Sequence, residues 1–377
     1  MKPINKILLI TLLMTPILLI GCDPWSSYPP DDRFGGNLYD GELVWEEVIE
    51  SAPWVARYRH ETTVFDGKLW ILGGYGYQGV SKDSYLEDVW FSEDGVTWEN
   101  TTMDASWGGR SGHAVVTFDN ALYLIGGYAV LEAEESTHET NHYTNDVWRS
   151  TDGITWVEVP ASADFGARAY HEAVVVEVDG TDTIFVIGGR KNGTDYYNDI
   201  WKSTDGENWT QVLSSDDKEI LGKRAAMATS VVGTKIYIMG GFTEDYEVAE
   251  VNKTDWKKIR VFDTVTETMS KADRTGGSYY ENRAMMEMVP FDGDLYLFGG
   301  VDVRREYNMQ YSTFYSTWRY SYGSNDWSLD SAGSGFGPRY GYGAEIFDDG
   351  HGEKIWILGG FSSSGPKNDV MTAEMGD

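Results

Sequence analysis

Residues 69–74 have the sequence LWILGG, a short apolar run that ends in two glycines, and this pattern returns five more times. The other copies lie at residues 122–127, 184–189, 236–241, 295–300 and 355–360. Their first glycines are 52 to 62 residues apart, so the chain consists of repeated units. Each run is too short for an ordinary helix and is rich in branched and aromatic residues, which predicts a buried strand.

Each glycine pair has the same neighbours. An arginine precedes the first glycine by 16 residues in four units and by 20 residues in two. Between them we expect two strands joined by a tight turn such as Phe65-Asp66-Gly67-Lys68. Downstream segments such as DVWRSTDGITW at residues 146–156 predict a third and a fourth strand. Six units of four strands predict an all-β, six-bladed propeller.

The fourth unit allows two positions for its outer strand. Trp256 lies 27 residues before Arg283, whereas Met269 lies 14 residues before it. Because this interval is 12 or 15 in the clearer units, we place Met269 on the fourth strand.

The sixth unit has no room for a fourth strand before the chain ends at residue 377. Upstream, Trp45 lies 12 residues before Arg57, an interval seen in the other units. We therefore expect residues 44–48 to complete the last blade and close the ring.

These features resemble the kelch repeat family over roughly Leu43 to Asp377. The resemblance implies a kelch-type β-propeller whose last blade is closed by the N-terminal strand. Some kelch relatives are enzymes. A galactose oxidase-like copper site needs a cysteine crosslinked to tyrosine, and the only cysteine is Cys22. An activity similar to that of kelch sialic acid mutarotases would need an arginine and a carboxylate in the channel, and no spacing selects that pair.

The N-terminus, residues 1–21, resembles the signal peptide of a bacterial lipoprotein. Two lysines precede an apolar run at residues 7–20, and LIGC places a cysteine at the processing site. The resemblance implies cleavage before Cys22 and its lipidation; the alternative is an ordinary signal peptide with a chance cysteine. Residues 22–42 are expected to form a flexible tether, and residues 43–377 the propeller. The expected location is the bacterial cell envelope, at the periplasmic side of the outer membrane or the cell surface.

The chain carries a formal net charge of −30. Such an acidic surface repels nucleic acid and anionic lipid headgroups, so we expect neither as a partner, apart from attachment to the membrane through the lipid. We expect a monomer without a cofactor.

The six repeat arginines should gather on one face, near the mouth of the central channel. They are Arg57, Arg110, Arg168, Arg224, Arg283 and Arg339. Long aromatic loops between second and third strands lie on the same face. From these loops we add five candidate ligand-binding residues, namely Arg304, Arg305, Tyr307, Tyr77 and Tyr196. Arginines and aromatic rings can stack on sugars, grip a peptide or bind a carboxylate. The alternative for the repeat arginines is a structural role, paired with acidic side chains or carbonyls.

The predicted function is a membrane-anchored binding module for a glycan or a peptide. The alternative is a carbohydrate-active enzyme or sugar isomerase that uses an arginine-lined channel mouth. A carboxylate with a raised pKa beside an arginine there would favour the enzyme, and an aromatic face without one would favour binding.

Two histidine patterns are also notable. Residues 138–142, HETNH, match the HExxH motif of zinc peptidases, but that chemistry needs a helix and this segment is expected in a loop, so we predict no metal site. His60, His113 and His171 each follow a repeat arginine by three residues and are expected to pack inside the blades.

Overall fold

The computed structural model describes most of the chain from residue 42 onward. The described ranges are 42–77, 83–131, 140–160, 164–214, 221–243, 259–271, 283–302, 313–314, 316–322, 326–331 and 335–376. The chain divides into two compact units, residues 1–38 and 39–377, and every described residue belongs to the second. Within the described ranges, no helix has the length and apolarity needed to cross a membrane.

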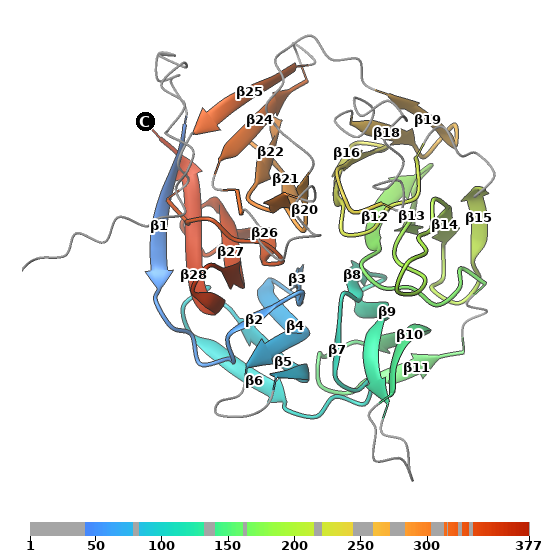
Figure 1. Cartoon of the computed structure of the whole chain (residues 1–377), viewed down its shortest axis with the longest axis horizontal. Helices are drawn as coiled ribbons and strands as arrows, with labels where there is room; N and C mark the ends of the chain where they lie inside the picture. The colour runs from blue at the N-terminus through green and yellow to red at the C-terminus, as the bar shows by residue number, and fades with distance from the viewer. Residues whose placement is uncertain are drawn as a thin grey trace, which may run out of the picture. The chain divides into compact units, whose positions relative to one another are not determined.

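The main strands of the second unit fall into six antiparallel groups of four, arranged around a common centre (Figure 1), and a further short strand joins the first and the last group into one nine-stranded sheet. Blade 1 consists of β3 (Glu61–Phe65), β4 (Lys68–Tyr77), β5 (Asp83–Ser92) and β6 (Trp98–Thr102). Blade 2 consists of β8 (Ala114–Phe118), β9 (Ala121–Leu131), β10 (Thr140–Ser150) and β11 (Val157–Val159). Blade 3 consists of β12 (Glu172–Val178), β13 (Thr181–Ile187), β14 (Ile200–Ser203) and β15 (Thr210–Leu213).

The remaining three blades repeat this order. Blade 4 consists of β16 (Ala228–Val232), β17 (Lys235–Met239), β18 (Arg260–Asp263) and β19 (Thr268–Lys271). Blade 5 consists of β21 (Glu287–Phe291), β22 (Asp294–Phe298), β24 (Thr317–Ser321) and β25 (Asp326–Ser331). Blade 6 consists of β26 (Gly343–Asp348), β27 (Glu353–Ser362), β28 (Gly365–Met375) and β1 (Leu43–Ile49). The prediction of an all-β propeller is confirmed.

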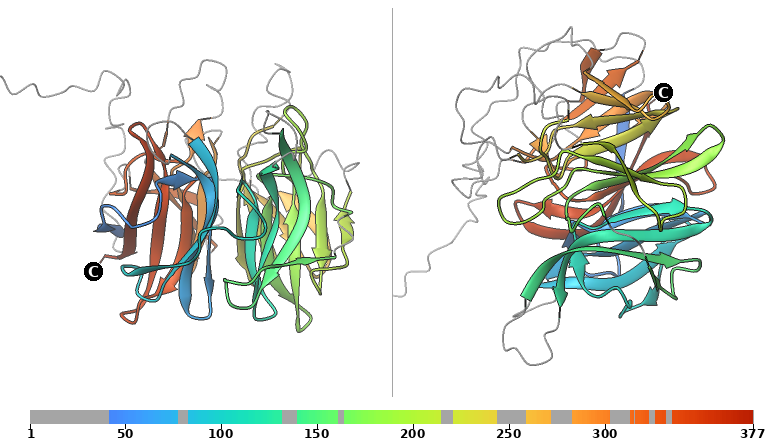
Figure 2. Two further views of the ribbon diagram at one scale, coloured as in Figure 1. Left: turned by 90° about the horizontal axis from the view of Figure 1, so that it is seen from below. Right: turned by 90° about the vertical axis from the view of Figure 1, so that its right-hand side faces the viewer.

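Four short strands lie where the chain enters a blade or leaves its second strand. They are β2 (Arg57–Tyr58), β7 (Arg110–Ser111), β20 (Arg283–Ala284) and β23 (Val301–Asp302). The repeat arginine therefore precedes the innermost strand of its blade. A short stretch without strand pairing separates the two. The strands of each blade run between two faces of the unit (Figure 2). We call the face that carries these short strands and the connections between second and third strands the channel-mouth face.

The N-terminal strand closes the ring as predicted. β1 pairs antiparallel with β28, with Leu43 opposite Met375 and Trp45 opposite Ala373. The Trp45 ring packs against the rings of Phe298 and Phe336, at centroid distances of 5.4 and 4.7 Å. The first described strand of the unit is thus held by its last.

The predicted register of blade 4 is also confirmed. β18 and β19 pair with Phe262 opposite Met269, so Met269 lies on the fourth strand. The turn predicted between the first two strands of blade 1 is present, since Phe65 pairs with Lys68 across Asp66 and Gly67, both with positive φ.

A ring of backbone hydrogen bonds joins all six blades at the centre. The residue two positions after each repeat arginine donates its N–H to the carbonyl of its counterpart in the preceding blade, at 2.6 to 3.0 Å. In chain order these residues are Arg59, Gly112, Tyr170, Ala226, Met285 and Gly341. All six have φ between 52° and 60°, the left-handed region in which side chains other than glycine are uncommon. The ring thereby fixes the positions of four side chains around the channel mouth, those of Arg59, Tyr170, Ala226 and Met285.

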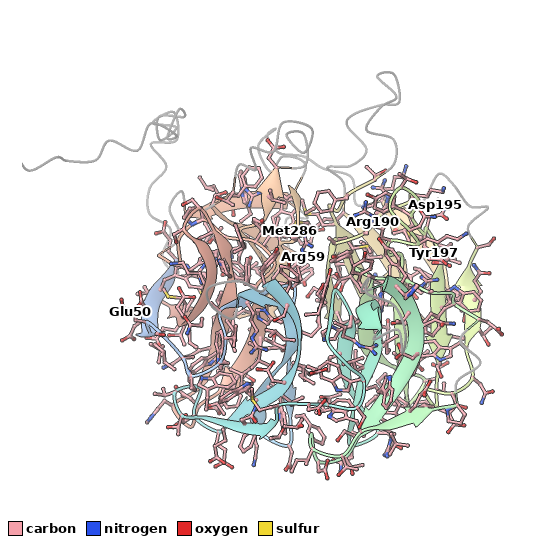
Figure 3. All side chains as sticks on the ribbon, turned by 60° about the horizontal axis from the view of Figure 1, so that its bottom comes forward. Glu50, Arg59, Arg190, Asp195, Tyr197 and Met286 are labelled. Atoms are coloured by element: carbon pink, nitrogen blue, oxygen red, sulfur yellow. The ribbon has the colours of Figure 1, made fainter. Side chains whose placement is uncertain are left out.

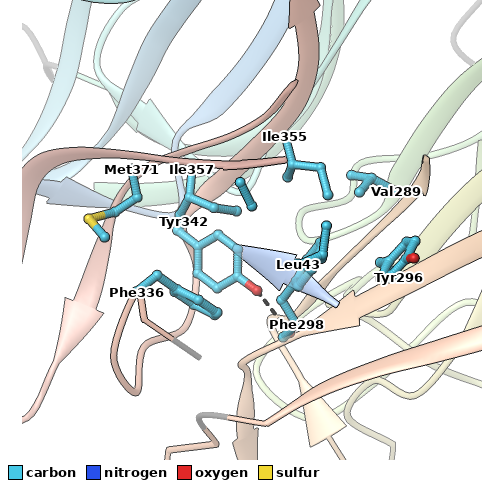
Figure 4. Packing of buried hydrophobic residues seen from close by; sticks show 10 residues of the cluster. Leu43, Val289, Tyr296, Phe298, Phe336, Tyr342, Ile355, Ile357 and Met371 are labelled. Atoms are coloured by element: carbon cyan, nitrogen blue, oxygen red, sulfur yellow. Dashed lines mark hydrogen bonds between the residues drawn. The ribbon is translucent and has the colours of Figure 1, made fainter. Parts of the chain in front are cut away.

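The core lies between blades. Figure 4 shows one such cluster, where Tyr342 donates its hydroxyl hydrogen to the carbonyl of Phe298 at 2.8 Å and packs beside Ile355 and Ile357. The glycine pairs allow this close packing. A Cβ at Gly74 would lie 2.6 Å from the Cβ of His60, so only glycine fits there.

Candidate functional site

The six repeat arginines lie inside the blades. Each is at most 5% exposed, and each donates a hydrogen bond from Nη1 to the carbonyl of the first glycine of its own pair. Arg57 also forms a two-pronged ion pair with Asp88, at 2.7 and 2.6 Å. Three further units repeat this ion pair, as Arg110–Asp146, Arg168–Asp199 and Arg339–Asp369.

This geometry corrects the prediction that the repeat arginines contact a ligand. The aspartate partners belong to the third-strand segment of their units, two residues before a tryptophan or methionine. This aspartate is part of the repeat pattern itself, so the repeat contains both members of the ion pair. In blade 5 a serine takes that place, and Arg283 donates to Ser316 Oγ at 2.6 Å. Because these guanidinium groups are buried and bonded within blades, we assign them a structural role and remove them from the candidate site.

The five loop candidates have different outcomes. Tyr196 lines a pocket on the channel-mouth face. Tyr77 ends β4, and its side chain lies outside the description. Arg304, Arg305 and Tyr307 lie outside the described residues, as does Cys22.

The pocket on the channel-mouth face has a volume of about 220 Å³. Five of the six blades contribute to its wall. The lining residues are Tyr58, Arg59, Tyr170, Arg190, Tyr196, Ala225, Phe242, Met285, Val301 and Tyr340. Three of them, Arg59, Tyr170 and Met285, belong to the central hydrogen-bonded ring. Five of the ten lining residues are aromatic and two are arginines, so hydroxyl groups, guanidinium groups and apolar atoms together form the wall.

Arg59 is held in place by aromatic rings. Its guanidinium carbon lies 5.1 Å from the ring centroid of Tyr58 and 5.2 Å from that of Tyr170, and Nη1 donates to Tyr170 Oη at 3.1 Å. Its Nε atom is buried and has no hydrogen-bond partner among the described residues. Burial lowers the pKa of Arg59, but the nearby tyrosines outweigh it and leave the pKa raised, so the group stays cationic. Arg59 is therefore a fixed cation on the pocket wall.

Arg190 completes the wall on the blade 3 side. Its Nε donates to the carbonyl of Asn192 at 3.0 Å, and its guanidinium also contacts the carbonyl of Gly193, so it supports the loop that presents Tyr196. It lies 5.7 Å from the Tyr196 ring. Figure 3 shows Arg59 and Arg190 at the same face of the unit.

No carboxylate lines the described part of this pocket. Carboxyls with a raised pKa do occur elsewhere, on the innermost strands of four blades, at Glu61, Glu172, Glu287 and Glu345. Burial is the main cause in each, and no arginine contributes to these shifts. An aromatic face with arginine and without an adjacent carboxylate favours binding over catalysis.

The histidines do not form a metal site in the described residues. No group of three or more histidine, cysteine, aspartate or glutamate side chains there could hold an ion. The described part of the HETNH segment, residues 140–142, is strand and belongs to β10, not to a helix. His60, His113 and His171 are buried, and burial lowers the pKa of His60 and His113 to about 3. They are neutral packing residues, as expected.

Fold and site together define a β-propeller with a small aromatic pocket at its channel mouth. The chain belongs to the KLHDC2/KLHL20/DRC7 Kelch-repeats domain family, whose model matches residues 112–360. Domains of this family generally mediate protein–protein interaction.

Individual relatives are more distant. The chain is 23% identical over 237 residues to the leucine-zipper-like transcriptional regulator 1 homolog of Drosophila melanogaster, covering 59% of this chain and 23% of that protein. It is 25% identical over 344 residues to the putative protein tag-53 of Caenorhabditis elegans, covering 87% of this chain and 24% of that protein. The chain thus spans about a quarter of the length of these relatives. The structure of YjhT has a TM-score of 0.65 at 13% identity, covers 88% of this chain and is itself covered completely, which indicates the shared fold.

Proposed function

We propose that this chain is a protein-binding module whose pocket takes an acidic group from an extended segment of a partner. The observation that carries the proposal is Arg59, a cation on the wall of a pocket with no carboxylate among its described lining residues. A carboxylate in the pocket would pair with this charge, and a charge-assisted hydrogen bond is about twice as strong as one between neutral groups. The aromatic rings of the wall would pack against the flanking part of the ligand.

The size of the pocket limits what it holds. A volume of about 220 Å³ suits one side chain or a chain end rather than a folded surface. The acidic exterior, with its net charge of −30, would repel a strongly acidic partner at long range. The fitting ligand is therefore a segment with one acidic group at the pocket and few other negative charges.

Selection from a random peptide library on the purified whole chain tests this proposal. We expect the recovered peptides to share one aspartate, glutamate or free C-terminal carboxylate. A parallel selection with Arg59→Gln should lose that preference, and one with the control Lys235→Gln should keep it. Lys235 is exposed, and it begins β17 at the face opposite the channel mouth. Peptides without a common acidic group would contradict the proposal.

We also propose that Cys22 is lipidated and anchors the propeller in the bacterial cell envelope. The support is the sequence pattern, an apolar run after two lysines that ends in LIGC. Mass spectrometry of the mature N-terminus should detect a lipid-modified Cys22, and Cys22→Ala should release the protein from the membrane fraction. An unmodified cysteine in the membrane-bound protein would contradict this assignment.

A further inference from the structure

A continuous row of tyrosines leads away from the pocket across blades 1 and 2. We call it the tyrosine strip, and its members are Tyr58, Tyr75, Tyr85, Tyr128 and Tyr143. Successive ring centroids are 5.6, 5.0, 5.8 and 5.0 Å apart. All five side chains are partly exposed, and Tyr58 is also part of the pocket wall.

Strand pairing fixes the order of the strip. Tyr58 lies opposite Tyr75 where β2 pairs with β4, and Tyr75 lies opposite Tyr85 where β4 pairs with β5. In blade 2, Tyr128 lies opposite Tyr143 where β9 pairs with β10. Directly paired residues on neighbouring strands have side chains on one side of the sheet, so their rings meet. The glycine pairs precede these positions in β4 and β9, so the tyrosines belong to the strand extensions on the channel-mouth face.

The rings of the strip do not stack face to face. Neighbouring planes are inclined by 80°, 72°, 55° and 69°, so ring edges as well as ring faces contribute to the strip. Two successive steps place the centroids of next-but-one rings at most about 11 Å apart, and closer if the row bends. A polyproline II helix repeats every three residues, about 9 Å. This repeat lies within the upper limit for next-but-one rings, so successive prolines can each contact a ring of the strip.

We propose that the tyrosine strip binds a proline-rich segment in the polyproline II conformation, next to the acidic group held in the pocket. Aromatic grooves recognise such segments because the extended helix is preformed and loses little entropy on binding. The strip itself consists of neutral side chains, which suits a neutral proline-rich segment. This inference rests on the proposed function, since it describes the residues that flank the acidic group.

Two matched peptides of about ten residues test the inference by calorimetry with the whole chain. Each has one aspartate at an end; one continues with repeated Pro-x-x-Pro, and in the other alanine replaces the prolines. We expect the proline peptide to bind about tenfold more tightly, because its prolines contact two or more aromatic rings and its extended helix is already formed before binding. Tyr128→Leu and Tyr143→Leu should each remove most of that advantage.

A control tyrosine is available in blade 5. Tyr322 packs against Tyr237 and Tyr320 beside the turn that follows β24, away from the strip. Tyr322→Leu should leave both affinities unchanged, and circular dichroism with melting curves checks that all three variants fold. If Tyr128→Leu or Tyr143→Leu does not fold, the phenylalanine variant at the same position takes its place. Phenylalanine keeps the aromatic ring, so this variant should still bind the proline peptide more tightly than the alanine peptide.

The outcomes separate the two proposals. If both peptides bind equally and both weaken in Arg59→Gln, the pocket proposal stands and the strip inference is wrong. If neither peptide binds, both are wrong. A linear glucan oligosaccharide serves as a third probe: its binding to the strip, lost in Tyr128→Leu, in place of a preference for proline would also overturn the inference.

Discussion

Arg59 Nη1 donates a hydrogen bond to Tyr170 Oη at 3.1 Å, although the two residues are 111 positions apart in the chain. They occupy equivalent positions in blades 1 and 3, and Gly112 is their counterpart in the blade between. A Cβ at Gly112 would lie 2.5 Å from the Tyr170 ring. Because Gly112 has no Cβ, the Tyr170 ring can lie beside it and reach Arg59. The contact between Tyr170 and Arg59 shapes the pocket wall.

Gly112→Ala should disturb the pocket more than its backbone strain alone explains. Both Gly112 and Gly67 have positive φ, 59° and 67°, so alanine at either costs about 1–2 kcal/mol. A Cβ at Gly67 would meet nothing within 4 Å, which makes Gly67→Ala the matched control. We expect both variants to melt at a lower temperature and only Gly112→Ala to bind the acidic peptide more weakly. Equal affinities in the two variants would show that Tyr170 does not position the site.

The buried ion pairs should matter for stability. Asp199→Asn leaves Arg168 buried with a weakened partner, and removal of one member of such a pair costs about 3–5 kcal/mol. Asp182→Asn, at an exposed position in β13, is the control and should be nearly neutral. Chemical denaturation measures both free energies of unfolding. A loss below about 1 kcal/mol in Asp199→Asn would contradict the structural role of the repeat arginines.

Closure of the ring by β1 predicts a further loss. Deletion of residues 40–50 removes the strand paired with β28 and exposes its edge, so the melting temperature should fall by several degrees or more. Trp45→Ala keeps the strand but removes the ring packed on Phe298 and Phe336, and should have a smaller effect. Val44→Ala, at an exposed position on the same strand, serves as the control. An unchanged melting temperature after the deletion would refute closure.

The carboxyls with a raised pKa predict a dependence of stability on pH. Burial raises the pKa of Glu345 from 4.5 to about 8, although a hydrogen bond from Thr62 opposes the shift. The folded chain thus binds this proton more tightly than the unfolded chain, so the stabilising proton is lost and stability falls as pH rises from 4.5 to 8. Glu345→Gln should reduce the fall in melting temperature across this window, with Glu61, Glu172 and Glu287 causing the remainder, whereas the exposed Glu177→Gln should leave the fall unchanged. Parallel pH profiles for Glu345→Gln and the unaltered chain would be inconsistent with a buried acid.

The fold could be predicted because each repeat feature has a strong local cause. The glycine pairs mark places where a Cβ would collide with the next strand, and Trp45 and Met269 could be placed from intervals alone. The ring of backbone hydrogen bonds was not predicted, because its six positions share a φ value and not a residue type.

The site was only partly predictable for the same reason. The sequence analysis selected the repeat arginines as ligand-binding candidates because they recur at regular intervals. That regularity arises because they pair with the aspartates of the third strand. Arg59 lies two positions after one of them, where the other units have glycine, tyrosine, alanine or methionine. An arginine at a position that the repeat leaves free was the available signal. Tyr196 lies in a loop and was identified on that basis.

The most direct test is a double-mutant cycle between Arg59 and the acidic residue of a selected peptide. Calorimetry would give four dissociation constants, for the unaltered chain and Arg59→Gln, each with the peptide and with its amide counterpart. We predict that the unaltered chain prefers the acidic peptide about tenfold, which corresponds to about 1.4 kcal/mol, and that Arg59→Gln shows no preference. An equal preference in both proteins would contradict the assignment of Arg59 as the residue that binds the acidic group.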